Sequence, residues 1–368
     1  MKQLTITVKD ALDSLLPVAV FAASEKSPLP IHNFVLIKIQ NGAVYAISTN
    51  GAQTLTRRIA STIDADMQLC VSGIKLRAIL SGLKDIDGQK PLTISDKGSE
   101  GVLKVGRSKL VLETLPPTSF PSPLKLGSEN TEVTLPASIL LDGVKSVIHA
   151  VAERHTHLFF NGLNIILENN TLSLVSSDGH RLSRVIRTDV TTTAGRINAI
   201  LPRRFLDLLP LVPKTEHIRL KVDSNMAEVT WGYGQIRSNL IDASFPDTKQ
   251  HFSASGIEAF TVNRESLLSA ITRLNATAED KRPVIQLTKD AGDLKLVTLN
   301  IQNAVTGEDF LPAKLETDFT ICLNLRYLQD ALCGIQDDLV SFEQFDMRFI
   351  ALKGVNSQRV ELIAPIRV

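Results

Sequence analysis

The feature that most constrains this chain is an internal repeat. Residues 33–51 (NFVLIKIQNGAVYAISTNG) and residues 161–179 (NGLNIILENNTLSLVSSDG) align without a gap at a constant offset of 128 residues. Each segment alternates apolar and polar residues on both sides of an Asn-containing turn, and each ends in a second polar turn. Alternation with a period of two residues around such a turn predicts a β-hairpin. A weaker third copy covers residues 284–300, so one structural unit is expected three times.

Helix-like segments precede the hairpins and recur in the second half of each copy. Apolar residues at helical spacing predict a first set of helices, with a kink or a shifted helix at Pro17, over residues 9–24, 136–152 and 263–275. A second set is predicted over residues 72–84, 202–211 and 324–335. The order helix, strands, helix, strands in each copy predicts an α+β fold. Pro-, Ser- and Gly-rich stretches predict three domains, at residues 1–124, 125–253 and 254–368.

Composition excludes several classes of protein. The 368 residues include 40 basic and 39 acidic side chains, a formal net charge of +1, and 43% are hydrophobic, which excludes a disordered or collagen-like chain. The longest apolar run, residues 15–23, is shorter than the ~20 residues of a membrane helix, and no signal-peptide pattern begins the sequence. Three widely spaced cysteines (Cys70, Cys322 and Cys333) predict reduced thiols in a cytoplasmic protein.

The sequence carries no motif of a common enzyme class. It contains no phosphate-binding loop, no dinucleotide-binding glycine motif, no HExxH and no CxxC. His155 and His157 have no third metal ligand near them in the sequence, so neither a metal nor a cofactor is predicted. Ser177, Asp178 and His180 are too close in the chain to converge as a catalytic triad, and a polar turn is the preferred interpretation. No catalytic residue is assigned; a hydrolase that uses His180 with Asp178 is the competing hypothesis.

The second copy and the end of the chain together suggest a groove. The polar turn of the second copy continues as His180-Arg181-Leu182, which places two large polar side chains beside apolar ones. The chain ends in the apolar sequence LIAPIRV, whereas chain ends are usually polar and loose. We therefore expect this end to be ordered and packed on the body of the protein, where its last residues form the floor of a peptide-binding groove.

Several of these segments resemble one family. The threefold repeat, DGHRL at residues 178–182 and PIRV at residues 365–368 resemble the bacterial DNA polymerase III β subunit, the sliding clamp. Further matches are LPI at 29–31 and GRS at 106–108 in the first copy, and NG at 161–162 and FPD at 245–247 in the second, so that with PIRV the matches span all three copies. The resemblance implies a DNA-clamp fold and a ring-shaped, head-to-tail homodimer with three repeated domains in each chain.

The resemblance also implies a function without catalysis. Such a ring encircles double-stranded DNA without sequence preference and acts as a processivity factor. Its expected partners are the DNA polymerase III α subunit, the clamp-loader δ subunit, and other polymerases and repair proteins with a clamp-binding motif. Most of them are expected to insert a short segment that contains Gln and Leu and ends in apolar residues.

By the same resemblance, the peptide-binding pocket lies between the second and third domains. The residues expected there are Phe160, Ser177, Gly179, His180, Arg181, Leu182, Pro246, His251, Asn324, Tyr327, Arg348, Leu362, Ala364, Pro365, Ile366 and Arg367. Of these, His180 and Arg181 are expected at the rim, where they reach the backbone or a Gln side chain of the peptide.

The ring also requires a DNA-contacting face and a dimer contact. A small excess of basic residues on the helices is enough for phosphate contacts without base readout, and those expected are Lys26, Lys75, Arg154, Arg203, Arg204 and Lys281. Residues 102–112 alternate like an exposed edge strand, which invites pairing with another strand. The dimer contact is expected to join it to the third domain of a second subunit, through Arg107, Lys109, Ala276 and Thr277.

Some positions depart from the family pattern. Phe160, His251 and Ala364 stand where the pocket often has aliphatic or Met residues. The acidic run of the third domain is reduced mainly to Glu308 and Asp309, and the pI of about 7.7 is higher than is usual for a clamp. These departures are compatible with a divergent, accessory or mobile-element-borne clamp. A third hypothesis is a clamp-fold protein that assembles but no longer serves a replicative polymerase.

Overall fold

The computed structural model describes most of the chain. The described residues are 3–24, 27, 29–40, 42–59, 67–188, 190, 195–253, 257–278, 283–300, 302, 304–315, 317–345, 348–355 and 358–367. They form two compact units. The first unit comprises Met1–Ala137 and Asp207–Leu240, and the second comprises Ser138–Leu206 and Ile241–Val368. The division into three domains at residues 124/125 and 253/254 stays a prediction.

The first unit contains two antiparallel sheets. A four-stranded sheet has the order β1 (Gln3–Thr7), β6 (Pro91–Asp96), β7 (Gly101–Val105) and β8 (Ser108–Leu112). A nine-stranded sheet has the order β10 (Thr131–Pro136), β15 (His217–Val222), β16 (Met226–Trp231), β17 (Gly234–Asn239), β4 (Gln53–Ile59), β3 (Ala43–Thr49), β2 (Phe34–Gln40), β5 (Met67–Ser72) and β9 (Thr114–Leu115).

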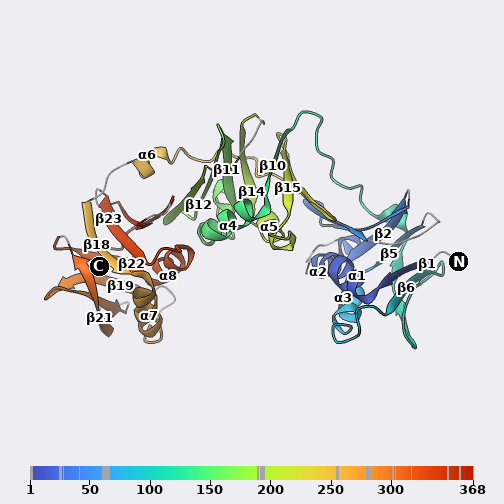
Figure 1. Cartoon of the computed structure of the whole chain (residues 1–368), viewed down its shortest axis with the longest axis horizontal. Helices are drawn as coiled ribbons and strands as arrows, with labels where there is room; N and C mark the ends of the chain where they lie inside the picture. The colour runs from blue at the N-terminus through green and yellow to red at the C-terminus, as the bar shows by residue number, and fades with distance from the viewer. Residues whose placement is uncertain are drawn as a thin grey trace. The chain divides into compact units, whose positions relative to one another are not determined.

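The helices of the first unit are short. They are α1 (Val8–Asp10), η1 (Ala11–Leu15), α2 (Leu16–Ser24), η2 (Pro30–Asn33), α3 (Gly73–Ser81), η3 (Pro117–Ser119) and η6 (Leu209–Leu211). Helices α2 and α3 lie side by side (Figure 1). They approach so closely because Gly73 has no side chain: a Cβ there would lie 2.6 Å from Ala22 Cβ.

The second unit contains one twelve-stranded antiparallel sheet. Its order is β14 (Ile197–Pro202), β11 (Gly162–Glu168), β12 (Thr171–Ser177), β13 (Arg181–Arg187), β25 (Arg359–Ile363), β24 (Phe349–Gly354), β23 (Leu339–Phe345), β18 (Ile257–Asn263), β21 (Val305–Leu315), β20 (Asp293–Leu299), β19 (Val284–Asp290) and β22 (Thr320–Asn324). Its helices are α4 (Ala137–Val147, whose first residue belongs to the first unit), η4 (Ile148–Ala150), η5 (Leu158–Asn161), α5 (Arg203–Leu206), α6 (Lys249–Ser253), α7 (Arg264–Asn275) and α8 (Leu325–Gly334).

The three predicted hairpins are confirmed as β2–β3, β11–β12 and β19–β20. Each has a two-residue loop, because Gln40 pairs with Ala43, Glu168 with Thr171, and Asp290 with Asp293. Two-residue loops that follow the twist of the strands need positive φ at their central residues. Accordingly Asn169 and Asn170 have φ of 51° and 58°.

The first predicted helix contains the irregularity expected at Pro17. Residues Ala11–Leu15 form a π-helical turn between α1 and α2. Pro17 has no N–H to donate to the carbonyl of Asp13, four residues earlier. That carbonyl instead accepts a hydrogen bond from Arg57 Nη2 of β4, at 3.0 Å. Strand and helix are thereby tied together at the point where the proline interrupts the helical ladder.

Two predicted elements were wrong in extent. The helix predicted over residues 202–211 is only α5 and the 3₁₀ turn η6, because Pro210 cannot continue an α-helical ladder. The edge strand predicted over residues 102–112 is the hairpin β7–β8, which turns at Gly106 with φ of 56°. Because the turn contains two residues, the alternation of apolar and polar positions continues in step from β7 into β8. The sequence pattern therefore did not reveal the turn. Among the described residues, β8 is the outer strand of its sheet.

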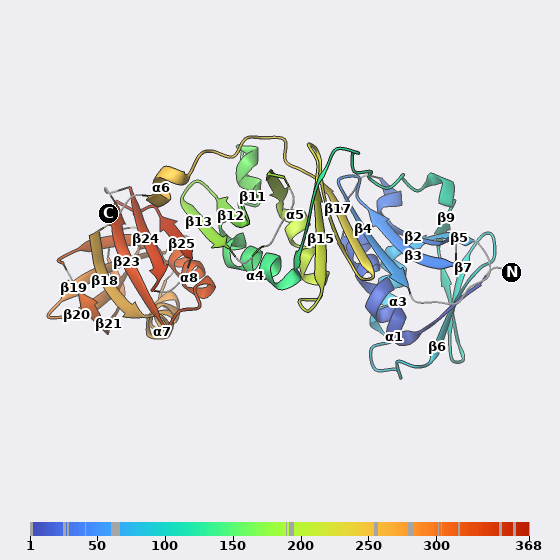
Figure 2. The same cartoon turned by 45° about the horizontal axis from the view of Figure 1, so that its top comes forward.

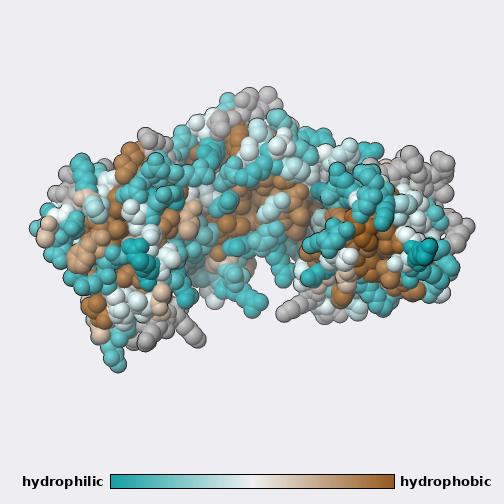
Figure 3. Space-filling view, turned by 60° about the horizontal axis from the view of Figure 1, so that its bottom comes forward, coloured by the Kyte–Doolittle hydropathy of each residue, from teal (hydrophilic) through white to brown (hydrophobic). Residues whose placement is uncertain are grey.

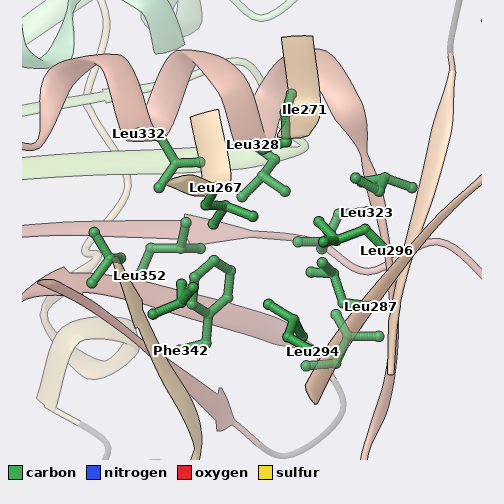
Figure 4. Packing of buried hydrophobic residues seen from close by; sticks show 14 of the residues in the cluster. Leu267, Ile271, Leu287, Leu294, Leu296, Leu323, Leu328, Leu332, Phe342 and Leu352 are labelled. Carbon is green, nitrogen blue, oxygen red and sulfur yellow. The ribbon is translucent and has the colours of Figure 1, made fainter. Parts of the chain in front are cut away.

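A large core holds the C-terminal part of the second unit together. Helices α7 and α8 lie side by side against its strands (Figures 1 and 2). Figure 4 shows Leu267 and Ile271 of α7 with Leu328 and Leu332 of α8 above Phe342 and the leucines of the sheet. Asn263 and Asn324 cap the two helices, with their side chains accepting backbone N–H groups of the first turn. On the face seen in Figure 3, apolar residues also reach the surface in patches.

This core generates a stability prediction. Leu328 is fully buried, so Leu328→Ala should lower the free energy of unfolding by about 2–5 kcal/mol through reduced burial and a residual cavity. Arg326→Ala, on the exposed face of the same helix, is the matched control and should change it by less than about 0.5 kcal/mol. Urea unfolding followed by circular dichroism measures both. Equal losses of stability for the two variants would show that α8 does not pack as described.

Candidate functional site

The polar turn of the second copy is held by its own side chains. Asp178 Oδ1 accepts hydrogen bonds from the backbone N–H groups of His180 and Arg181, at 3.0 and 3.1 Å. Ser177 Oγ donates to the carbonyl of Arg181 at 2.7 Å and accepts from the N–H of Gly179. Gly179 has φ of 88°, which favours glycine. The turn interpretation is therefore confirmed, and two of the three triad-like groups, Ser177 and Asp178, hold the turn together.

Arg181 leaves this turn toward the interior. Its Nε donates to Asp178 Oδ2 at 2.9 Å and its Nη1 to Asp330 Oδ2 of α8 at 2.7 Å. Its Nη2 donates to the carbonyl of His149, and its guanidinium lies 4.3 Å from the ring centre of Tyr327. Only 9% of the residue is exposed. The prediction that Arg181 is a rim group was wrong, because its donors are engaged inside the protein. His180 is exposed, as expected of a rim group.

A buried carboxylate lies behind the turn. Glu361 of β25 is fully buried, and it accepts hydrogen bonds from Arg359 Nε at 2.8 Å, His149 Nε2 at 3.1 Å and Ser183 Oγ. Burial by itself raises the pKa of this carboxyl. The Arg359 charge and the hydrogen bonds from His149 and Ser183 nevertheless hold the pKa of Glu361 below its ordinary value. The carboxylate is therefore ionised and ties η4, β13 and β25 together.

The end of the chain is ordered, as the apolar ending predicted. Strand β25 pairs with β13, with Leu362 opposite Leu182 and Ile363 opposite Arg181. The chain then continues between two elements: the N–H of Ala364 donates to the carbonyl of His180 at 2.9 Å, and the N–H of Ile366 donates to that of Cys322 at 2.7 Å. We call residues 364–367 the tail. It bridges the polar turn and β22.

An apolar pocket lies beside the polar turn. Its volume is about 150 Å³, and it is lined by Phe160, Ser177, Gly179, Arg181, Leu182, Phe245, Pro246, Thr248, His251 and Phe349. Aromatic rings form much of its wall. The ring centres of His251 and Phe349 lie 5.4 Å apart in an edge-on contact, and those of Phe160 and His155 lie 4.8 Å apart. A volume of this size suits one large apolar side chain.

A second, larger cavity lies along the tail. Its volume is about 610 Å³, and we call it the tail cavity. It is lined by Gly179, Gln286, Thr320, Ile321, Cys322, Gln344, Arg348, Phe349, Ile350, Ala364, Pro365, Ile366 and Arg367. Because Gly179 and Phe349 line both hollows, the apolar pocket and the tail cavity adjoin.

The structure gathers most of the expected pocket residues at these two hollows. Phe160, Ser177, Gly179, Arg181, Leu182, Pro246 and His251 line the apolar pocket; Arg348, Ala364, Pro365, Ile366 and Arg367 line the tail cavity. The remaining four line neither. Leu362 is fully buried beneath the pocket against Leu182, Asn324 caps α8, Tyr327 stacks on Arg181, and His180 is exposed at the turn.

Sequence reasoning missed several lining residues. Phe245 could have been found, since it stands in the FPD segment that already matched the family pattern. Phe349, Gln286 and Cys322 carried no signal, because each stands in an ordinary strand whose partner was unknown.

The predicted DNA-contacting residues differ in exposure, whereas the predicted dimer residues are all exposed. Lys75, Arg154 and Arg204 are exposed, Lys75 forming an ion pair with Glu113 at 3.4 Å, whereas Arg203 Nη1 donates to the carbonyl of Ile148. Lys26 and Lys281 lie outside the described residues. The predicted dimer residues Arg107, Lys109, Ala276 and Thr277 are all exposed.

The described residues give no support to the competing enzyme and metal hypotheses. Both carboxylate oxygens of Asp178 are occupied by the turn and by Arg181, so Asp178 is not oriented toward His180 as an acid–base partner. His155 Nδ1 accepts the N–H of His157, and no group of three or more potential ligands gathers among the described residues. No described helix is long and apolar enough to cross a membrane.

Comparison with known proteins agrees with this geometry. The family models of the DNA polymerase III beta subunit match over its central domain (residues 134–247) and C-terminal domain (residues 252–367). The beta sliding clamp of Pseudomonas putida is 24% identical over 98% of both chains.

Solved structures show the same fold over the whole chain. A sliding clamp from Bartonella birtlesii, solved with bound griselimycin, superposes with a TM-score of 0.91 at 24% identity and covers 100% of both chains. One from Pseudomonas aeruginosa, also bound to griselimycin, gives 0.89 at 23% identity, covering 100% of this chain and 99% of the other. The chain therefore belongs to the bacterial DNA polymerase III beta subunit family, the sliding clamps, which are non-catalytic processivity factors.

Proposed function

We propose that two copies of this chain form a ring around double-stranded DNA and tether DNA polymerases and repair proteins to it. The partners are the DNA polymerase III α subunit, the clamp-loader δ subunit and other proteins with a clamp-binding segment, in the cytoplasm. The domains of each copy are residues 1–124, 125–253 and 254–368. The observation that carries the proposal is the apolar pocket beside the ordered tail. A processivity assay tests the proposal: polymerase processivity should rise only when the clamp and a clamp loader are both present. No rise would indicate a clamp-fold protein without a replicative role.

The pocket supports peptide binding because of what its wall offers. Aromatic and aliphatic groups (Phe160, Leu182, Pro246 and Phe349) surround a space for one large apolar anchor. The exposed His180 stands beside it and supplies a polar group for the peptide backbone or a Gln side chain. A few buried anchors with polar groups at the rim are the usual means of binding a short peptide. Two clamps of the same fold were solved with griselimycin bound.

The pocket generates the first functional prediction. Deletion of residues 364–368 removes four residues that line the tail cavity, which adjoins the apolar pocket, and should weaken binding of a polymerase-derived peptide by at least about tenfold, since removing central contacts costs more than ~1 kcal/mol. Leu362→Ala should do the same by loosening the support under Leu182. Calorimetry measures the affinities. Sedimentation of each variant should show an intact dimer, and unchanged affinity after the deletion would place the partner site elsewhere.

A rim substitution, compared with a control substitution away from the pocket, refines this prediction. His180→Ala should weaken the same peptide less than the tail deletion does, because rim contacts stay hydrated. Arg219→Ala, an exposed residue of β15 in the first unit, is the control and should leave the affinity unchanged. A loss of affinity for His180→Ala as large as that of the deletion would make His180 a central contact instead.

Two open strand edges support the dimer. Strand β8 is the outer strand of its sheet among the described residues, with Val111 52% exposed. Strand β21 pairs with β20 through residues 305–312 and with β18 only through residues 313–315. Among the described residues, the edge of residues 305–312 that faces away from β20 is therefore unpaired. Gly307 of that half lies against Thr277, one of the predicted contact residues.

The two edges carry side chains of opposite charge. Lys104, Arg107 and Lys109 are exposed on the β7–β8 hairpin. Glu308 and Asp309 stand on β21, where they form ion pairs with Lys295 at 3.3 Å and Arg273 at 2.6 Å. An antiparallel or parallel pairing of β8 with β21 of a second copy is heterologous, and a ring forms if it closes after two copies.

The second functional prediction concerns assembly. Sedimentation at micromolar concentration should show a species near twice 40.2 kDa. Arg107→Glu combined with Lys109→Glu should shift it toward the monomer, since like charges then face each other across the edge. Arg219→Glu should leave the dimer intact. A strict monomer for the unmodified protein would reject this interface.

The third functional prediction concerns DNA. Arg203 and Arg204 begin α5, and replacing both with Ala should weaken DNA binding equally for all sequences and lower the salt slope by about one for each phosphate that is no longer neutralised. Arg219→Ala, on a strand, should not change the slope. Binding to duplexes of unrelated sequence, titrated with salt, measures it. An unchanged slope for the double variant would remove α5 from the DNA-contacting face.

A further inference from the structure

One short segment supplies much of the wall of the apolar pocket. Four of the lining residues come from the same stretch of chain: Phe245, Pro246, Thr248 and His251. We call residues 245–252 the strap; it ends inside α6. The hydrogen bond from the N–H of His251 to the carbonyl of Thr248, at 3.0 Å, joins two residues of the strap and so does not attach it to the sheet. Whatever holds the strap against the sheet therefore also sets the shape of the pocket.

The strap is anchored at its end by Phe252. The half-buried ring of Phe252 packs on the apolar cluster that contains Leu182 and Leu362. The guanidinium carbon of Arg184 lies 3.9 Å from the centre of the same ring. Leu182 and Arg184 stand two residues apart on β13, so they share one face of the sheet. Phe252 covers that face and joins the strap to the strand beside the pocket.

The ring of Phe252 offsets the cost of burying Arg184. The Nε of Arg184 is buried and has no hydrogen-bond partner among the described residues, and burial lowers the pKa of its guanidinium. A buried donor without a partner is destabilising. The face of an aromatic ring is its negative side, and a guanidinium stacked on it is attracted more strongly as water is excluded. The stack therefore stabilises the buried charge and, in turn, holds the strap.

We propose that Arg184 and Phe252 are positioning residues for peptide binding: their stack fixes the strap, and the strap presents its four wall residues to the apolar anchor of a partner. Neither residue lines the pocket itself. This inference rests on the proposed peptide-binding function. When the stack is lost, the strap populates other positions. A peptide then binds only the fraction of molecules whose wall is complete, so its apparent affinity falls.

Two phenylalanine substitutions in the full-length protein test the proposal. The probe is a synthetic peptide, acetylated and amidated, that carries one Gln followed by Leu and Phe. Phe252→Leu keeps an apolar side chain but removes the ring, and it should weaken this peptide about three- to tenfold, the range of a half-buried cation–π contact. Phe319→Leu is the control. It also removes an aromatic stack, with Phe260 at 4.8 Å, but Phe319 lines neither hollow and the affinity should stay unchanged.

Further variants identify the contact that matters. Phe252→Tyr keeps the ring and should bind the peptide as the unmodified protein does. Arg184→Met keeps a long side chain without the charge and should weaken the peptide as Phe252→Leu does. Because both substitutions act through one stack, combining them should weaken binding little more than the stronger single substitution does. Calorimetry measures the four affinities.

Hydrogen exchange measures the strap directly. In the free Phe252→Leu protein the backbone amides of the strap should exchange faster, whereas those of β23 should exchange as before. A change confined to the strap separates a positioning role from a general loss of stability, because general loss would raise exchange throughout the unit.

The outcomes separate the anchor from the pocket. Unchanged peptide affinity in Phe252→Leu, or an equal loss in Phe319→Leu, overturns the inference while the peptide pocket stands. A loss for Phe252→Tyr as large as for Phe252→Leu also overturns it, since the ring is still present. Strictly additive losses in the combined variant do the same, because the two residues then act separately. If the unmodified protein does not bind the peptide, the proposed function and this inference fail together.

Discussion

The carboxylate of Glu361 is the buried charge on which the second unit depends. Strands β13 and β25 are the neighbours that join the β14–β11–β12–β13 half of its sheet to the half that runs from β25 to β22. Glu361 lies opposite Ser183 at this joint and collects Arg359 and His149. A buried ion network adds little net stability, but removing one member typically costs about 3–5 kcal/mol, since an unpaired charge is left inside. The register of the joint is therefore strongly specified.

That register positions everything at the candidate site. It sets Leu182 against Leu362 under the apolar pocket, and it sets Arg181 beside the start of the tail. Because the tail follows β25 directly, its hydrogen bonds to His180 and Cys322 are possible in this register and impossible in one shifted by a residue. The buried ion network around Glu361 thus fixes the positions of the residues that line the apolar pocket, although Glu361 itself does not line it.

The parts of the fold that sequence could predict are those with local causes. Asn169 and Asn170 made the second hairpin predictable because an Asn pair tolerates the positive φ that the loop needs. The irregular helical turn near Pro17 was predictable because proline lacks the N–H that a regular helix needs, whatever the rest of the fold. The β7–β8 hairpin was missed because its turn at Gly106 leaves the alternation intact on both sides.

The candidate site was predictable mainly through family resemblance. Its lining comes from segments far apart in the chain, such as Phe160, Pro246 and Phe349, and no local pattern brings them together. Arg181 shows the limit of such transfer: its type and position matched the pattern, yet its guanidinium reaches inward to Asp330, a partner about 150 residues away that periodicity cannot reveal.

The polar turn has a counterpart at the joint between β4 and β17. Position 50 corresponds to 178 and position 53 to 181, and there Asn50 Nδ2 donates to Gln53 Oε1 at 2.8 Å, while Gln53 Nε2 donates to Ser238 Oγ across the joint. At the β4–β17 joint the turn is therefore held by the neutral amides of Asn50 and Gln53. At the β13–β25 joint it is held by Arg181, whose guanidinium lies between the carboxylates of Asp178 and Asp330. The two copies of the turn therefore respond differently to truncation: loss of the Arg181 side chain would leave the carboxylates of Asp178 and Asp330 without their shared cation, whereas loss of the Gln53 side chain would leave only neutral groups unpaired.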